Sequence, residues 1–162
     1  MGDKITFAVL TLSDKGALGQ REDLSGPAIA ELIKDIGVVK VYEILPDERE
    51  LIKTKLVELT NTVDVIFTTG GTGLSPRDVT PEATLEVLDR QIPGISEAMR
   101  QAGLAKTKRA MLSRAVAGQR GNTLIINLPG SLKAVKENLE VIRDVIPHAV
   151  EKIKGDTADC GR

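Results

Sequence analysis

The feature that most restricts the fold is the alternation of short apolar strands with amphipathic helices in the N-terminal part of the chain. Apolar, β-forming runs lie at Lys4–Leu12, Val38–Leu45 and Val63–Thr69. Between them, apolar residues recur every three or four positions, which is the spacing of a helix that covers one face of a sheet. Strand–helix–strand order is typical of parallel strands, and near-continuous apolar strands are typical of sheets buried on both faces. The sequence therefore predicts an α/β fold.

The rest of the chain continues this pattern. It predicts helices at Thr80–Leu88 and Ile95–Leu104, a strand at Gly121–Leu128, a short strand at Val116–Ala117, and a helix capped by Ser131 whose apolar positions run to Ile146. The chain has 162 residues and no internal repeat or long linker, so its size suits one domain. We expect a three-layer α/β/α sandwich with a mostly parallel sheet over residues 1–155, followed by a flexible tail at 156–162.

Composition excludes several classes of function. The net charge is −1 and aromatic residues make up 2% of the chain, whereas nucleic-acid binders show a basic excess or aromatic stacking platforms. The single histidine, His148, argues against a Ser–His–Asp triad, and the single cysteine, Cys160, excludes an internal disulfide and a multi-thiolate zinc site. No apolar run approaches the ~20 residues of a membrane helix, and no targeting signal is visible. We expect a cytoplasmic protein that binds neither nucleic acid nor membrane.

The most informative motif is the glycine-rich segment that follows the third strand. Ligands bind beyond the carboxyl ends of strands in open α/β sheets, and glycines there let backbone N–H groups approach a phosphate. The segment matches neither the Walker A motif nor G-x-G-x-x-G, so a plain connection is an alternative. Neighbouring hydroxyl and guanidinium groups favour phosphate, and we predict phosphate contacts from Gly70, Gly71, Thr72, Gly73, Ser75 and Arg77.

Two aspartates have both a structural and a catalytic interpretation. Asp78 precedes Thr80-Pro81 and could simply order a turn or a helix start. Asp47 begins a run of charged residues close to a capping box, so it could cap a helix. Alternatively, both lie at strand ends and could share Mg²⁺, which takes one or two carboxylates plus substrate phosphates.

Two further segments belong at the same sheet edge. Asn127–Ser131 follows a strand and precedes a helix, so it is either a turn with a serine cap or a second anion site. The loop Thr11–Leu24 follows the first strand and would face a ligand, although the sequence gives none of its residues a role. It includes Ser13, Asp14, Lys15, Arg21 and Asp23. Ser113-Arg114 lies between the other motifs, and its pattern alone is typical of exposed residues without a functional role.

Together, these motifs resemble the molybdopterin adenylyltransferases of molybdenum-cofactor biosynthesis. The resemblance runs from Ile5 to about Gly155, and the order and spacing of its short motifs make it specific. The matching segments are Leu45–Asp47, Thr69–Gly73, Pro76–Thr84, Pro93–Gly94, Met111–Arg114, Gly118–Gly121 and Asn127–Gly130.

The resemblance implies a three-layer α/β domain that forms homotrimers and transfers AMP from ATP to the terminal phosphate of molybdopterin, with Mg²⁺ and release of pyrophosphate. By position, Asp47 and Asp78 match the catalytic, metal-associated aspartates of the family, and Gly70 to Gly73 match the loop around the nucleotide phosphates. The molybdopterin-binding positions would be Ser113, Asn127, Pro129, Gly130 and Ser131.

Alternatives remain open. The fold recurs in proteins that insert the metal and in scaffolds, so the chain could bind or carry molybdopterin without catalysis. The presence of both aspartates favours the enzyme, which would pass its product to a downstream metal-insertion protein. A structural protein without a small ligand would require both glycine-rich loops to be ordinary turns.

Overall fold

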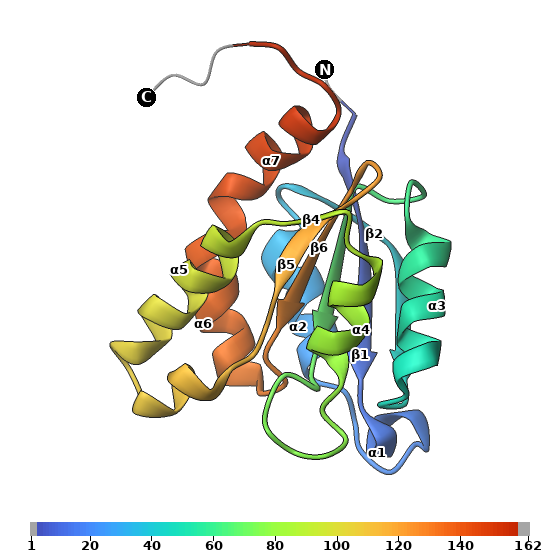
Figure 1. Ribbon diagram of the computed structural model, residues 1–162, viewed down its shortest axis with the longest axis vertical. Helices are drawn as coiled ribbons and strands as arrows, with labels where there is room; N and C mark the ends of the chain where they lie inside the picture. Colours follow the sequence, from blue (N-terminus) through green and yellow to red (C-terminus); the bar gives the residue numbers. More distant parts are fainter. Residues whose placement is uncertain (1–2, 159–162) are drawn as a thin grey trace.

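A central sheet of six strands organises the structure, a computed structural model that describes residues 3–158 (Figure 1). The spatial order of the strands is β2-β1-β3-β6-β5-β4. β1, β2, β3 and β6 run parallel, and β5 and β4 extend the sheet antiparallel beyond β6. The strands are β1 (Ile5–Leu12), β2 (Gly37–Leu45), β3 (Val65–Thr69), β4 (Arg90–Gln91), β5 (Ala117–Arg120) and β6 (Thr123–Leu128).

Helices cover both faces of this sheet. They are α1 (Asp14–Ala17), α2 (Ser25–Ile33), α3 (Arg49–Leu59), α4 (Thr80–Val87), α5 (Pro93–Leu104), α6 (Leu132–Ile142) and α7 (Ile146–Ile153), with 3₁₀ turns at Lys108–Leu112 and Arg143–Val145. Within residues 3–158, none of the helices combines the length and apolarity that crossing a membrane requires.

Alternation along the strands divides the core into two layers. Phe7 and Val9 of β1 pack with residues of α2, α5, α6 and α7 on one face, whereas Ala8 and Leu10 pack with α3 and α4 on the other. The rings of Phe7 and Phe67 stack in the first layer, with centroids 5.7 Å apart. Because successive side chains of a β-strand point to opposite faces of the sheet, fully apolar strands contribute side chains to both core layers. This confirms the predicted three-layer α/β/α fold.

Two local predictions differ from the structure. The segment after β1, expected to be an irregular loop, contains the short helix α1. The helix predicted from Ser131 to Ile146 ends at Ile142, and α7 starts after a 3₁₀ turn with Pro147 in its first turn. A proline cannot donate the backbone hydrogen bond of a helix interior, so it marks a new helix start. Of the predicted tail, residues 156–158 are described, and residues 159–162, with Cys160, lie outside the described residues.

The parallel strands bring four connections to one edge of the sheet. The segments after β1, β2, β3 and β6 all leave the carboxyl ends of their strands there, and Figure 1 shows these loops together at the end of the sheet beside α1. The loops that carry most of the predicted site residues therefore meet at the position where open α/β sheets bind ligands.

Candidate active site at the carboxyl edge of the sheet

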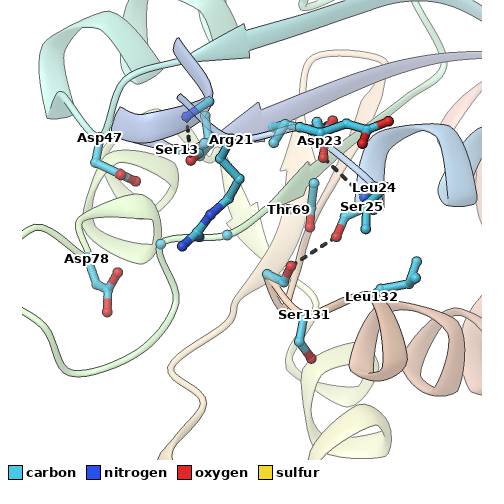
Figure 2. Close-up of a pocket in the computed structure, with 17 residues that line it drawn as sticks. Ser13, Arg21, Asp23, Leu24, Ser25, Asp47, Thr69, Asp78, Ser131 and Leu132 are labelled. Atoms are coloured by element: carbon cyan, nitrogen blue, oxygen red, sulfur yellow. Dashed lines mark hydrogen bonds between the residues drawn. The ribbon is translucent and has the colours of Figure 1, made fainter. Parts of the chain in front are cut away.

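A cavity of about 490 Å³ lies at this edge (Figure 2). We call it the first cavity. All four connections contribute to its wall, and both Asp47 and Asp78 line it. The lining residues are Thr11, Leu12, Ser13, Gly16, Arg21, Glu22, Asp23, Leu24, Ser25, Asp47, Thr69, Gly70, Gly71, Asp78, Gly130, Ser131 and Leu132.

Asp47 is held by the β1–α1 connection. Its Oδ2 accepts a hydrogen bond from the backbone N–H of Asp14 (3.1 Å), and its own N–H donates to Oδ1 of Asp14 (2.9 Å). Within the described part of the chain, Asp47 Oδ1 is buried and has no hydrogen-bond partner. Burial raises the pKa of Asp47, and the nearby charges of Asp14 and Asp78 add to the rise. The interpretation of Asp47 as a helix cap is wrong, because α3 has Glu48 at its N-cap position.

Asp78 lines the same cavity from the loop before α4. The N–H of Ser75 donates to Oδ2 of Asp78 (3.0 Å), and the Asp78 N–H donates to the Ser75 carbonyl (2.9 Å). Asp78 therefore orders a turn, as its structural interpretation predicts. Figure 2 shows that its carboxylate also lies on the same side of the cavity as that of Asp47. Asp78 thus stabilises the turn and also lines the cavity.

The donor set fits a magnesium ion. An unpartnered, buried carboxylate oxygen is costly unless a cation or donor reaches it, and Asp47 Oδ1 is such an atom. Among residues 3–158, no cluster of three His, Cys, Asp or Glu side chains could bind a metal by itself. Mg²⁺ does not require such a cluster, because substrate phosphates and waters complete its oxygen shell. Asp47 and Asp78 are the residues that would hold it.

Arg77 does not line the cavity. Its Nε and Nη2 donate to the two carboxylate oxygens of Asp14 (3.0 and 2.9 Å), and Nη2 also pairs with Glu48 (2.9 Å). This hydrogen bonding lowers the pKa of Asp14. Because Asp14 in turn contacts Asp47, Arg77 links the glycine-rich loop to the loop that holds Asp47. The structure assigns it positioning contacts where the sequence predicted a phosphate contact.

Two of the glycines that line the first cavity have backbone conformations that favour glycine. Gly70 and Gly71 have φ angles of 99° and 69°, a region that side chains disfavour. A Cβ on Gly70 would lie 2.5 Å from the carbonyl oxygen of Leu12, and one on Gly71 would lie 2.3 Å from Thr80 Oγ1. Substitution at either position would therefore displace the loop from β1 or α4.

Arg114 fastens the remainder of this loop, a role that sequence reasoning missed. Its Nε donates to the Gly73 carbonyl (2.8 Å), its Nη2 donates to the Asp78 carbonyl (2.9 Å), and its Nη1 pairs with Glu82. The Arg114 N–H also donates to the Thr72 carbonyl (2.9 Å). A serine followed by an arginine gives no signal of these contacts, since they join segments far apart in the sequence.

The second glycine–proline loop is tied to the first cavity through its carbonyl groups. Thr69 Oγ1 donates to the Pro129 carbonyl (2.7 Å), and Ser25 Oγ donates to the Gly130 carbonyl (2.9 Å), the bond drawn in Figure 2. Ser131 Oγ accepts from the Ala134 N–H (3.3 Å), which confirms the predicted cap of α6. This loop therefore lies between β3, α2 and α6 at the cavity wall.

Asn127 differs from the other predicted contacts of this loop, because its side chain is fully buried. Its Nδ2 donates to Thr68 Oγ1 (2.9 Å) and Thr84 Oγ1 (3.0 Å), and its Oδ1 accepts from the Val116 N–H (3.2 Å). The structure does not bring this amide to a cavity. Its hydrogen bonds instead join β3, β6, α4 and the segment before β5.

A second cavity, of about 360 Å³, adjoins the first. Ser131 lines both, and Ser113, Thr72, Gly73 and Pro129 line the second. The other lining residues are Ser96, Met99, Arg100, Gly103, Thr107, Arg109, Ala110, Leu112, Ala115, Ala134, Glu137 and Asn138. Ser96 is buried, and within residues 3–158 its Oγ has no hydrogen-bond partner.

The predicted site residues thus fall into separate places. Gly70, Gly71 and Gly130 line the first cavity together with Asp47 and Asp78. Ser75, like Arg77, lines neither cavity. His148 lies on α7, away from both.

Several wall residues were given no ligand-binding role from the sequence. They are Thr11, Arg21, Asp23 and Ser25 in the first cavity, and Ser96 and Arg100 in the second. The position of the Thr11–Leu24 segment after β1 was the signal for Thr11, Arg21 and Asp23, and Ser25 follows this segment directly at the start of α2. The second group lies on α5, and the apolar pattern of that helix gave no signal that Ser96 and Arg100 line a cavity.

Comparison with known proteins gives consistent matches. Residues 8–153 match the family described as "Probable molybdopterin binding domain". Molybdopterin adenylyltransferase from Helicobacter pylori (strain J99) is 43% identical over 157 residues, covering 94% of this chain and 89% of that protein. The crystal structure of the molybdopterin biosynthesis enzyme MoaB from Thermus thermophilus has a TM-score of 0.87 and 49% identity, covering 94% of this chain and 98% of that one.

A longer relative matches over one part only. Gephyrin from Dictyostelium discoideum is 47% identical over 154 residues, which cover 88% of this chain. The chain spans only 21% of the length of that gephyrin. Because the family match and the relatives of comparable length extend over most of the sequence, the chain belongs to the molybdopterin-binding domain family, as the resemblance of its motifs predicts.

Proposed function

We propose that this chain is a molybdopterin adenylyltransferase, which transfers AMP from ATP to the terminal phosphate of molybdopterin and releases pyrophosphate. The observation that carries the proposal is the pair of adjoining cavities, one lined by Asp47 and Asp78 and the other by Ser113, separated by the loop that ends at Ser131. Two anionic substrates could meet at this loop. The curated relative from Helicobacter pylori carries the name of this activity.

In the proposed reaction, a phosphate oxygen of molybdopterin attacks the α-phosphorus of ATP. A new P–O bond forms to AMP while the bond to the leaving pyrophosphate breaks. The nucleophile is already anionic at neutral pH, so no general base is needed, in agreement with a site without histidine. Positioning and charge stabilisation then dominate, as in phosphoryl transfer generally. Mg²⁺ bound by Asp47 and Asp78 would supply the positive charge that offsets repulsion between the two substrates.

The chain's own residues would orient the substrates. The glycine backbone at Gly70 and Gly71 would allow close approach of nucleotide phosphates. Arg114 holds the rest of this loop through the Gly73 and Asp78 carbonyls. Arg77 fixes Asp14, whose N–H fixes Asp47. These contacts preorganise the two carboxylates before substrate arrives, which lowers the cost of reaching the reactive geometry.

The second cavity would hold the pterin end of molybdopterin. Arg100 donates to the carbonyls of Ser113 (3.3 Å) and Ala115 (2.9 Å), so it shapes the wall that carries Ser113. Ser96 presents a buried hydroxyl without a partner to this cavity. A ligand with polar edges, such as a pterin, would satisfy that hydroxyl.

The Ser96 hydroxyl provides a test that separates binding from folding. Because Ser96 Oγ makes no hydrogen bond within the described residues, Ser96→Ala should leave the melting temperature unchanged or slightly raised. If Oγ contacts the pterin, the same change should weaken molybdopterin binding by about tenfold, the scale of one hydrogen bond in a dry site. Calorimetric titration with molybdopterin measures this, and unchanged affinity would remove Ser96 from the site.

The decisive assay for the function is pyrophosphate release from ATP and Mg²⁺, with and without molybdopterin. We expect release only when molybdopterin is present. Tight molybdopterin binding without release would instead identify a non-catalytic binding or carrier protein of the same fold. We further propose that the chain acts in the cytoplasm as a homotrimer and delivers its product to a downstream metal-insertion protein, by analogy with its family.

A further inference from the structure

We propose that Arg21 binds the leaving pyrophosphate in the first cavity and so positions ATP for the transfer. The inference rests on the proposed function for the reaction. It concerns a residue that neither the motifs nor the family match singles out.

The charge of the first cavity calls for such a residue. Its wall carries four carboxylates, from Glu22, Asp23, Asp47 and Asp78, and Arg21 is the single basic side chain among its described lining residues. A polyphosphate entering this cavity meets repulsion from all four. A divalent cation at Asp47 and Asp78 neutralises one part of the ligand, and Arg21 is the cation available to the rest.

Other cations near the cavity are already engaged. Arg77 is paired with Asp14 and Glu48, and Arg114 is paired with Glu82 and backbone carbonyls. Within residues 3–158, by contrast, no hydrogen bond or ion pair involves the side chain of Arg21. Figure 2 shows it extending across the cavity between Thr69 and the two aspartates. Its guanidinium is therefore free to accept an anion as a partner.

Among the described residues, the carboxylate of Asp23 forms no ion pair with Arg21, because other donors occupy both of its oxygens. Asp23 Oδ1 accepts from the N–H groups of Ser25 (3.1 Å) and Gly26 (3.2 Å), and its Oδ2 accepts from Thr11 Oγ1 (2.6 Å) and Tyr42. Asp23 is thus used to fix the start of α2. The same contacts hold the backbone two residues after Arg21, so the arginine side chain extends from a fixed part of the chain.

In-line geometry assigns the pyrophosphate to this side of the site. The attacking and leaving oxygens lie on opposite sides of the phosphorus that is transferred. If molybdopterin attacks from the second cavity, past Ser131, the leaving group must lie deeper in the first cavity. Arg21 lines only the first cavity. A planar guanidinium can hold two phosphate oxygens at once, which suits a diphosphate.

The test compares Arg21→Gln and Arg21→Lys with a control from the same segment, Lys15→Gln. Lys15 is exposed, carries the same charge and lines neither cavity. Binding of pyrophosphate and of AMP to the full chain is measured by calorimetry in the presence of Mg²⁺. Arg21→Gln should weaken pyrophosphate binding by about tenfold or more, the scale of a charged hydrogen bond. It should leave AMP binding unchanged, and Arg21→Lys should restore part of the loss.

Several outcomes would overturn the assignment. They are unchanged pyrophosphate affinity in Arg21→Gln, an equal loss of AMP affinity, or a similar loss in Lys15→Gln. Because this experiment uses no molybdopterin, its result is separate from that of the transfer assay. If wild-type protein released no pyrophosphate with molybdopterin while Arg21→Gln still lost pyrophosphate affinity, the proposed reaction would fail and the phosphate-binding role of Arg21 would stand.

Discussion

Replacing Asp47 with asparagine should stabilise the protein at neutral pH and, in the same variant, reduce pyrophosphate release by at least about 100-fold. The loss of activity has the size seen when one preorganised electrostatic partner is removed from an active site. The gain in stability follows from the unpartnered Oδ1 of Asp47, because a buried charge without a partner costs more than a neutral amide in the same place. The Asp14 N–H can still donate to the asparagine carbonyl.

The pH dependence of this difference has a definite sign. Burial raises the pKa of Asp47 in the folded protein above that of the unfolded chain. The ionised carboxylate therefore lowers folding stability above the folded pKa, and the penalty disappears as pH falls below the unfolded pKa of about 3.9. Denaturant titrations at pH 7 should show the asparagine variant as the more stable protein, and the difference should shrink toward pH 4. A less stable variant at pH 7 would contradict this account of Asp47.

Asp78→Asn is the matched control for the stability effect, because it removes the other carboxylate that we assign to the metal site. Oδ2 of Asp78 already accepts from the Ser75 N–H, so we expect this variant to keep the fold without a comparable gain in stability. Its pyrophosphate release should fall as strongly as that of the Asp47 variant. Normal activity in either pure variant would exclude that aspartate from the metal site.

The sequence predicted the framework because its signal is local. A continuous apolar run such as Val63–Thr69 predicts a buried strand without knowledge of its neighbours. Once the strands are predicted to be parallel, their carboxyl ends must lie at one edge of the sheet. Gly70 and Gly71 were also recognisable, since a strand followed by glycines before a helix is visible in the sequence. The same reasoning brought the Thr11–Leu24 segment to the correct edge.

What the sequence could not predict are contacts between distant segments. Arg77 reaches Asp14 across 63 positions, and Arg114 reaches Gly73 across 41. Each arginine has several chemically reasonable partners, and only the folded geometry selects among them. The interpretation of Asp47 as a helix cap failed for the same reason, because its partner is Asp14 rather than the start of α3.

Asn127 provides the sharpest test of this distinction between ligand contacts and internal contacts. The resemblance to the family predicts that it binds molybdopterin, whereas its side chain is fully buried with three hydrogen bonds inside the protein. Removing the amide in Asn127→Ala would leave Thr68, Thr84 and the Val116 N–H without that partner. Each unsatisfied buried group costs about 1–3 kcal/mol, so we expect a loss of at least about 3 kcal/mol in the free energy of unfolding.

For a chain of this size, that loss corresponds to a fall in melting temperature of roughly 6–12 °C. Asn138→Ala is the matched control, because Asn138 lines the second cavity and makes one hydrogen bond, from its Nδ2 to the Ala134 carbonyl (2.7 Å). We expect Asn138→Ala to be much less destabilising. At a temperature where Asn127→Ala remains folded, its molybdopterin affinity should stay within a few-fold of the wild-type value. An unchanged melting temperature with lost molybdopterin binding would show instead that Asn127 contacts the ligand, and that the buried amide rotates or moves when the second cavity is occupied.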